Sequence, residues 1–419
     1  MNYNNNMLYN NNYTNMNMNY NNNMLYNNNY TNMNNNNIFN NNNQFQGFSL
    51  NQSKENYNEK VNAQKMEKRP HSSIHSNSNK SAAHYKFESN KFLKEYTRGL
   101  EINVGGNCYL NPTLQCLVNI KKLTNYFLKN KNNIDKNKNK LSNAFLELIE
   151  NLWKNDNNPY NPKNLKDLIG KMDPLISDTQ KSDLKDLILF FLETMHNELN
   201  KAKINNQNCI NINYQNNFDG YSEKYFKNNF HSIISEIFYG LYYSQITCNN
   251  CKKLSYNNGY FNILEIPPDE VYKFKKKTEK YITINECLEY YQKKVIKEYP
   301  CNECKKVVNG LNNFSILNSP KVLIIDFKTI NESNMDIKID FEEIINLKDI
   351  SFFKNDFKYE LIGVISKYDQ NGKSIQFIAF CKSFINNKWY KYNDSLVSLS
   401  SFKDIKRIRI PRLLFYSFK

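Results

Sequence analysis

Apolar residues are spread unevenly along the chain, and their spacing changes from helical to strand-like. Residues 1–50 are mostly Asn, Tyr and Met and contain no Asp, Glu, Lys, Arg or His. Further on, apolar residues recur with helical periodicity over residues 114–128, 141–153 and 183–199. Apolar runs then predict strands over residues 322–327, 359–366, 375–382, 389–392 and 413–418. Helices first and strands later predict an α+β fold.

The first part of the chain is of low complexity. The sixteen residues 2–17 recur as residues 19–34, and too few aliphatic side chains are present to close a core. We expect residues 1–50 to form a disordered Asn-rich tract, with a self-associating Asn and Tyr segment as the alternative. Residues 51–95 are polar and predict a linker, which leaves residues 96–419 as the folded domain.

Composition excludes several classes of protein. No apolar run approaches the roughly 18 residues of a transmembrane helix, and no secretory signal opens the chain. We therefore expect an intracellular protein, cytoplasmic or nuclear, in which cysteine pairs bind metal or act in catalysis. The 56 Lys and Arg against 40 Asp and Glu give a charge of +16. These lysines are dispersed and no base-reading module is present, so the pattern speaks against nucleic-acid binding.

Two CxxC pairs predict a metal site. Cys248 and Cys251 form the first pair, and Cys301 and Cys304 form the second. Two spacer residues allow both thiolates of a pair to reach one ion, and four sulfurs complete a tetrahedral structural zinc site. Free cysteines in loops and a redox CxxC are the alternatives, but each pair is followed by Lys-Lys and none opens a helix after a strand.

The segment 99–117 carries the strongest sign of chemistry. It reads GLEINVGGNCYLNPTLQCL, in which two glycines precede Cys108 at the start of an apolar helix. The helix dipole and free N–H groups favour a thiolate at such a position, as a nucleophile requires. Asn103 is close enough in sequence to donate a hydrogen bond to an oxyanion.

This segment resembles the cysteine box of the ubiquitin-specific proteases, GLxNxGNTCYxNSxLQxL. The resemblance places Cys108 at the nucleophile and Asn103 at the oxyanion hole, with one extra residue before Asn103. Further similarities run in order through residues 183–199, 235–251, 319–328 and 413–416. The family implies a papain-like peptidase fold with a thumb at about 98–228, zinc-binding fingers at about 230–317 and a palm at about 318–419. It also implies ubiquitin or a ubiquitin-like protein as partner, with further protein-complex partners possible and no membrane association.

The residue at the family's catalytic histidine position is an amide. The family has G-H-Y-x-A-Y where this chain has IQFIAF, so Gln376 stands in place of the base. An amide cannot take and return a proton near pH 7. Asn393 occupies the position that orients the histidine, and Lys367 replaces a second family histidine. His196 and His231, the histidines of the folded domain, lie far along the chain from the IQFIAF segment.

These substitutions point to a family member that is catalytically inactive or very weak. Ile375 replaces the glycine beside the histidine, and we expect its β-branched side chain to obstruct the channel that admits the Gly-Gly tail of ubiquitin in the family. Asp183 and Asp186 match the acidic positions that hold the Arg-containing tail, and Phe377 keeps an aromatic ring. We expect a ubiquitin-binding scaffold. The alternative is a functional thiol deubiquitinase with Cys108 as nucleophile and a base supplied from elsewhere.

Overall fold

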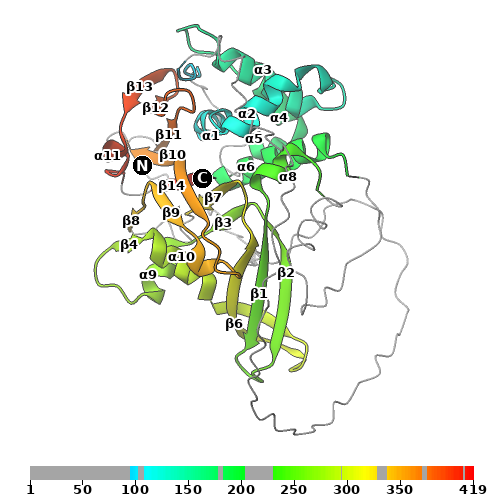
Figure 1. The fold of residues 1–419 in the computed structure, drawn as a ribbon, viewed down its shortest axis with the longest axis vertical. Helices are drawn as coiled ribbons and strands as arrows, with labels where there is room; N and C mark the ends of the chain where they lie inside the picture. The colour runs from blue at the N-terminus through cyan, green and yellow to red at the C-terminus, as the bar shows by residue number, and fades with distance from the viewer. Residues whose placement is uncertain are drawn as a thin grey trace, which may run out of the picture. The chain divides into compact units, whose positions relative to one another are not determined.

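A computed structural model describes residues 95–101, 108–177, 183–202, 230–293, 295–327, 337–369, 375–408 and 411–419. Its first part is helical (Figure 1). The bounds are α1 (Leu110–Val118), α2 (Lys121–Lys129), η2 (Lys131–Asn133), α3 (Lys140–Leu152), α4 (Lys163–Met172), α5 (Pro174–Ser177), α6 (Leu184–Leu199) and α8 (Ile233–Phe238). None of the helices in these ranges is long and apolar enough to cross a membrane.

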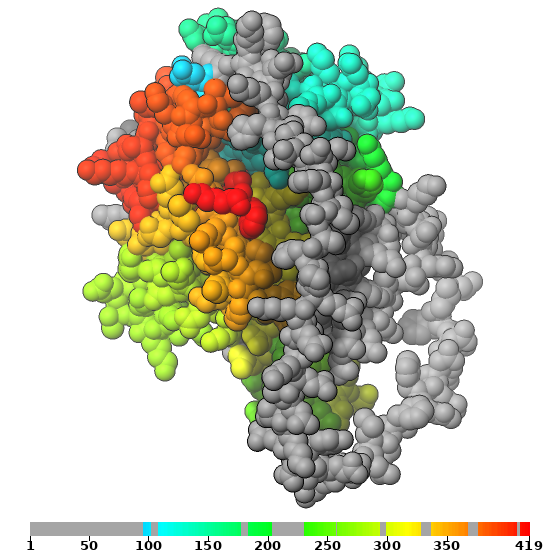
Figure 2. Space-filling model, viewed as in Figure 1, coloured from blue at the N-terminus to red at the C-terminus, as the bar shows by residue number. Residues whose placement is uncertain are grey.

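The large sheet follows the helices in sequence. Its order is β13-β12-β11-β10-β14-β7-β3, with β9 paired to β10, and only the β3–β7 pair is parallel. The bounds are β3 (Ile263–Glu265), β7 (Val322–Asp326), β9 (Ile344–Asn346), β10 (Lys358–Asp369), β11 (Ile375–Lys382), β12 (Trp389–Asn393), β13 (Leu396–Ser400) and β14 (Pro411–Phe418). The C-terminal residues, red in Figure 2, lie at the surface over β10.

A second, four-stranded sheet has the order β2-β1-β6-β5 and is antiparallel throughout. Its strands are β1 (Gly240–Cys248), β2 (Leu254–Phe261), β5 (Val295–Cys301) and β6 (Lys306–Asn318). Figure 1 shows that β1, β2 and β6 extend away from the helices. We call this the finger sheet.

The remaining elements are α9 (Pro268–Phe274), β4 (Tyr281–Thr283), α10 (Ile284–Lys293), β8 (Lys338–Asp340), η3 (Lys348–Ile350) and α11 (Phe402–Ile405). Strand β4 pairs in parallel with β8. Strand β3 falls within the range expected for the fingers, yet it belongs to the large sheet. The α+β fold class predicted from the sequence is confirmed.

Helix α1 forms the centre of the core. All nine of its residues are buried, because it lies between α2 and α6 on one side and β10, β11 and β12 on the other. Its polar side chains must therefore find partners inside the protein. Gln115 does so by donating to the carbonyl of Arg98 at 2.8 Å and accepting from the Thr97 hydroxyl at 2.6 Å.

The helical periodicity predicted over residues 114–128 is interrupted once in the structure. The structure has two helices, α1 and α2, with a break at Asn119 and Ile120. The Asn119 side chain donates to the carbonyl of Gln115 at 2.8 Å, and Ile120 is extended at φ −79° and ψ 104°. Asparagine side chains compete with the helical backbone in this way and favour helix ends.

A buried ion network fixes α6 to the large sheet. Asp183 caps α6 by accepting from the Lys185 N–H at 3.4 Å, and it accepts from Arg412 of β14 at 2.9 and 3.1 Å. Arg412 also donates to Asp326 of β7, whose side chain is fully buried. Burial raises the pKa of Asp326 to about 7, against the opposing effect of Arg412.

We predict that Asp326 makes the free energy of unfolding decrease as the pH rises from about 4 to about 7. In this window the folded state keeps a proton that the carboxyl of the unfolded chain, with its ordinary pKa of 3.8, has released. The slope approaches about 1.4 kcal/mol per pH unit. Urea unfolding at pH 5 and pH 7 should show a larger loss for the wild type than for Asp326→Asn, which cannot ionise. Equal losses in the two proteins would contradict this.

Candidate functional site

Cys108 lies in the turn directly before α1 and is exposed. Tyr109 occupies the N-cap position of α1 with helical backbone angles and no side-chain cap. The carbonyl of Tyr109 accepts from both the backbone N–H and the hydroxyl of Thr113, at 3.2 and 2.7 Å. The buried helix therefore presents the thiol at its N-terminal end.

The turn between β12 and β13 holds this end of α1. The buried Asn111 amide donates to the Asp394 carboxylate at 2.7 Å and to the Glu101 carbonyl at 3.1 Å. Asp394 is left-handed, with φ 50°, and its carbonyl accepts from the Leu100 N–H at 2.9 Å. A side chain at Gly99 would collide with the backbone of Ser395, since a Cβ there would lie 2.3 Å from its carbonyl oxygen. These contacts bring the segment before the thiol and the β12–β13 turn together.

Strand β11 lies against α1 and carries Gln376, which is half-buried. Its neighbour Phe377 meets the ring of Tyr109 edge-on, with 6.2 Å between centroids. Further along the same pair of elements, the sulfurs of Cys116 and Cys381 are 3.7 Å apart. Cys108 precedes Tyr109, and Gln376 precedes Phe377. The contact between the two rings therefore places the segment of Gln376 beside the segment of Cys108.

Asn393 ends β12, paired with Leu396 and adjacent to Asp394. The structure therefore brings the segments of Cys108, Gln376 and Asn393 together. Asn103 lies outside the described residues.

The electrostatic surroundings of Cys108 disfavour a thiolate. Its pKa is raised, chiefly by desolvation and also by the Asp394 carboxylate, while a backbone hydrogen bond offsets part of this. The sequence predicted that the N-terminal end of the helix would favour the thiolate and so lower the pKa of Cys108. The structure gives the opposite direction, a raised pKa. A nearby anion destabilises a second negative charge, and Gln376 offers none of the positive charge of an imidazolium.

The two described histidines lie together elsewhere. His196 of α6 is buried, and its Nδ1 is 2.6 Å from the Ser232 hydroxyl that caps α8. Burial lowers the pKa of His196 to about 4, so the ring is neutral at pH 7. His231 precedes that cap, and Lys367 is exposed on β10 opposite Phe377. Neither histidine takes the place of the missing base in this arrangement.

Of the two acidic positions expected to meet a ubiquitin tail, Asp183 is already bonded to Arg412. Asp186 is half-buried in the first turn of α6. The side chains of Asp183 and Arg412 are 25% and 15% exposed. Asp183 thus has a role within this chain that the sequence did not predict.

The four CxxC cysteines come together at the tip of the finger sheet. Cys248 ends β1 and Cys301 ends β5, so each pair lies in a hairpin turn. The sulfurs of Cys248 and Cys304 are 3.7 Å apart, and those of Cys251 and Cys301 are 3.6 Å apart. All four lie within 4.8 Å of one another.

This geometry fits a tetrahedral metal ion. Zinc–sulfur bonds of about 2.3 Å place tetrahedral sulfurs about 3.8 Å apart. In each turn the N–H of the second cysteine points to the sulfur of the first, at 3.5 Å for Cys251 and 3.4 Å for Cys304. Lys252 and Lys305, which follow the second cysteines, are both left-handed at φ 61° and 53°. The two turns are therefore matched in backbone as well as in sequence.

Three residues of these sites were missed at the sequence level. Asn111 and Asp394 each stand inside a quoted motif, so a search for polar residues beside the catalytic positions would have found them. Arg412 gave no signal, because its partners Asp183 and Asp326 are distant in sequence and meet only in the folded chain.

Comparisons with known proteins agree with this arrangement. A model of the family described as ubiquitin carboxyl-terminal hydrolase matches residues 98–416. Ubiquitin carboxyl-terminal hydrolase 2 of Bos taurus is 25% identical over 334 residues, covering 75% of this chain and 54% of that protein. Ubiquitin carboxyl-terminal hydrolase 15 of Homo sapiens is 30% identical over 181 residues, covering 39% of this chain and 18% of that protein. This chain therefore spans about half the length of the first relative and less than a fifth of the second.

A solved structure has a similar fold. The SAGA Ubp8/Sgf11/Sus1/Sgf73 DUB module bound to ubiquitin aldehyde matches with a TM-score of 0.56 and 22% identity, covering 77% of this chain and 69% of that one. The family match extends over most of the chain, from the segment before Cys108 to the last strand. The chain therefore belongs to the ubiquitin carboxyl-terminal hydrolase family.

Proposed function

We propose that this chain is a ubiquitin-binding member of its family with little or no hydrolase activity. The observation that carries the proposal is the environment of Cys108, where desolvation and, to a smaller extent, the Asp394 carboxylate raise the pKa of the thiol. Peptide hydrolysis by a cysteine needs a thiolate to attack and an acid to protonate the leaving amine. Gln376 supplies neither function.

Loss of the base is costly in enzymes of this kind. Removing it from a serine-protease triad lowers turnover by about 10⁴- to 10⁶-fold. The exposed thiol at the start of α1 favours the second candidate, a functional thiol deubiquitinase that uses Cys108. That candidate requires a proton acceptor other than Gln376.

Ubiquitin or a ubiquitin-like protein is the proposed partner. The names of the relatives and the ubiquitin aldehyde in the similar structure support this choice. Asp186 and Phe377 are the proposed contacts for the tail, with Asp183 acting mainly through Arg412. The similar structure is a module of several proteins, which supports further protein partners for this chain.

Structural zinc in the finger sheet is part of the proposal. The thiolates of Cys248, Cys251, Cys301 and Cys304 would hold the ion with no open position. We also propose an intracellular location, residues 1–50 as an Asn-rich arm and residues 51–95 as a linker. The proposed ranges are a thumb at about 98–228, fingers at about 230–317 and a palm at about 318–419, with β3 of the finger range contributing to the large sheet.

Hydrolysis of a ubiquitin–fluorophore conjugate tests the missing base. The wild-type chain should turn over below about 10⁻³ s⁻¹, about 10⁴-fold under a typical enzyme. Gln376→His should raise the rate, because an imidazole can take the thiol proton, and Cys108→Ala added to that variant should abolish the gain. Wild-type turnover near 10 s⁻¹, as ordinary enzymes reach, that disappears in Cys108→Ala would establish the second candidate instead.

Calorimetric titration with ubiquitin tests the partner. We expect saturable binding that Asp186→Asn weakens by about 3- to 10-fold, since an exposed or half-buried charge contact contributes roughly 0.5–1.5 kcal/mol. Glu150→Gln, an exposed change on α3, should bind as the wild type does. Asp183→Asn should instead lower the melting temperature, because it leaves Arg412 partly unpaired. Absence of binding at millimolar ubiquitin would leave only a scaffold for other proteins.

Zinc content tests the metal site. Purified chain should contain about one zinc ion, and Cys301→Ser should lose it, whereas Cys108→Ser should retain it. Removal by a chelator should expose the finger sheet to protease before the helices, because structural zinc supplies folding free energy. A zinc-free chain with unchanged protease resistance would rule the site out.

A further inference from the structure

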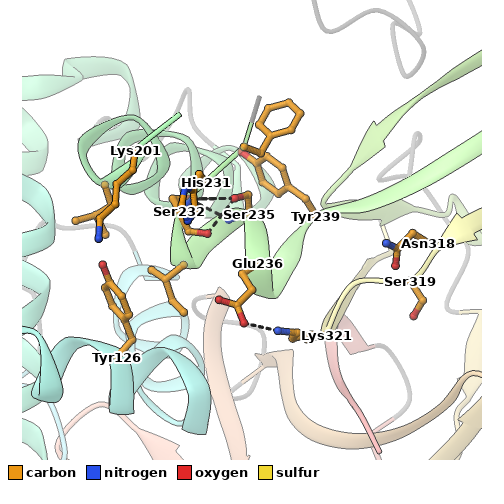
Figure 3. Close-up of a pocket in the computed structure, with 13 residues that line it drawn as sticks. Tyr126, Lys201, His231, Ser232, Ser235, Glu236, Tyr239, Asn318, Ser319 and Lys321 are labelled. Atoms are coloured by element: carbon orange, nitrogen blue, oxygen red, sulfur yellow. Dashed lines mark hydrogen bonds and ion pairs between the residues drawn. The ribbon is translucent and has the colours of Figure 1, made fainter. Parts of the chain in front are cut away.

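A cavity of about 640 Å³ opens where the helices meet the start of β7. Its walls come from α2, the end of α6, α8 and the segment 318–321 between β6 and β7. Figure 3 shows the side chains that converge on it. The volume lies within the range of small-molecule sites, roughly 300–1,000 Å³.

Positive charge exceeds negative charge around this cavity. Lys321 on one wall is paired with Glu236 of α8. Lys201 lies on the opposite wall, and in Figure 3 its amine points toward the Tyr126 hydroxyl. A third lysine, Lys122, stands beside Lys321, whose ammonium adds to burial in lowering the pKa of Lys122. The lining of the cavity thus holds two lysines and one carboxylate, and Lys122 adds a third ammonium next to Lys321.

The backbone at the start of α2 does not offset this excess of positive charge. Helix α2 begins at Lys121 with Lys121 and Lys122 in its first turn, no acidic residue there and no side-chain cap at Ile120. The N-terminal end of a helix carries partial positive charge, so lysines there are unfavourably placed. An anion near Lys122 and Lys321 would reduce both repulsions.

The Lys321–Glu236 pair leaves Lys321 available to a ligand. Their side chains are 38% and 58% exposed, and ion pairs with this exposure contribute little to stability. The hydroxyls of Ser232 and Ser235 are already used in the cap of α8. The lysines are thus the groups best able to bind a ligand.

Apolar and aromatic side chains form the rest of the wall. Leu199, Ile233, Phe230 and Tyr239 line the cavity together with Tyr126. Phe230 and Tyr239 meet edge-on, with 5.5 Å between ring centroids. The cavity therefore has an apolar and aromatic surface beside its lysines.

We propose that this cavity binds a small molecule carrying a phosphate monoester on an apolar or aromatic body. The phosphate would lie between Lys122 and Lys321, with Lys201 across the cavity, and the body would lie against Tyr126 and Tyr239. The site is separate from the proposed ubiquitin tail site. Helix α2 starts just past the C-terminal end of α1, whose nine residues set Cys108 apart by about 13 Å.

Calorimetric titration of the full chain with phenyl phosphate tests the proposal, at low ionic strength because exposed charges are screened by salt. We expect saturable binding with a Kd of about 1 mM or tighter. Inorganic phosphate should bind more weakly for lack of the ring, and phenol should bind more weakly for lack of charge.

Substitutions that remove either a positive or a negative charge test where the ligand binds. Lys321→Gln and Lys122→Gln should each weaken phenyl phosphate binding by about 10-fold, the effect of losing one charged hydrogen bond. Glu236→Gln should tighten binding, because it removes the competing carboxylate. Lys403→Gln, an exposed change on α11, should have no effect.

Three results would overturn the proposal. They are no saturable binding up to about 10 mM, which is ten times the expected Kd, phenol binding as tightly as phenyl phosphate, or equal affinities for Lys321→Gln, Lys122→Gln and Lys403→Gln. None of these outcomes depends on ubiquitin binding or hydrolysis, so failure here is distinct from failure of the proposed function.

Discussion

The hydrogen bond from Asn111 to Asp394 joins the buried helix α1 to the turn between β12 and β13 at 2.7 Å. Because α1 is buried along its whole length, its N-terminal end can be held only by groups inside the protein. The bond meets that need and, through Leu100 and the close approach at Gly99, fixes the segment before Cys108 as well. This junction holds the segments of Cys108 and Asn393 together, and the contact between Tyr109 and Phe377 brings the segment of Gln376 to them.

The same junction affects the thiol. It places the Asp394 carboxylate near Cys108, where its charge adds to the larger effect of desolvation in raising the pKa of the thiol. An imidazolium at position 376 would balance that charge and favour the thiolate. With Gln376 there, the negative charge of Asp394 is uncompensated. The raised pKa of Cys108 therefore agrees with the proposal that this chain has little or no hydrolase activity.

Much of this arrangement could be predicted from the sequence, and the remainder depends on contacts distant along the chain. Strand β11 was predicted with both ends correct, because a short apolar run with two isoleucines and two phenylalanines marks it. The helix break at Asn119 was missed, since the apolar spacing of α1 continues into α2 and only the asparagine side chain marks the break. The Cys108, Gln376 and Asn393 positions came from motifs. Two effects could not be predicted, because both depend on charges that only folding brings together. They are the effect of Asp394 on the pKa of Cys108 and the ion pair between Asp183 and Arg412.

The pKa of the Cys108 thiol tests this account most directly. It can be measured from the pH dependence of iodoacetamide alkylation, with Cys108→Ala used to subtract the reaction of other thiols. The account predicts a pKa above the value of about 8.5 for an ordinary free cysteine. A pKa below about 7, as in activated cysteine nucleophiles, would contradict it.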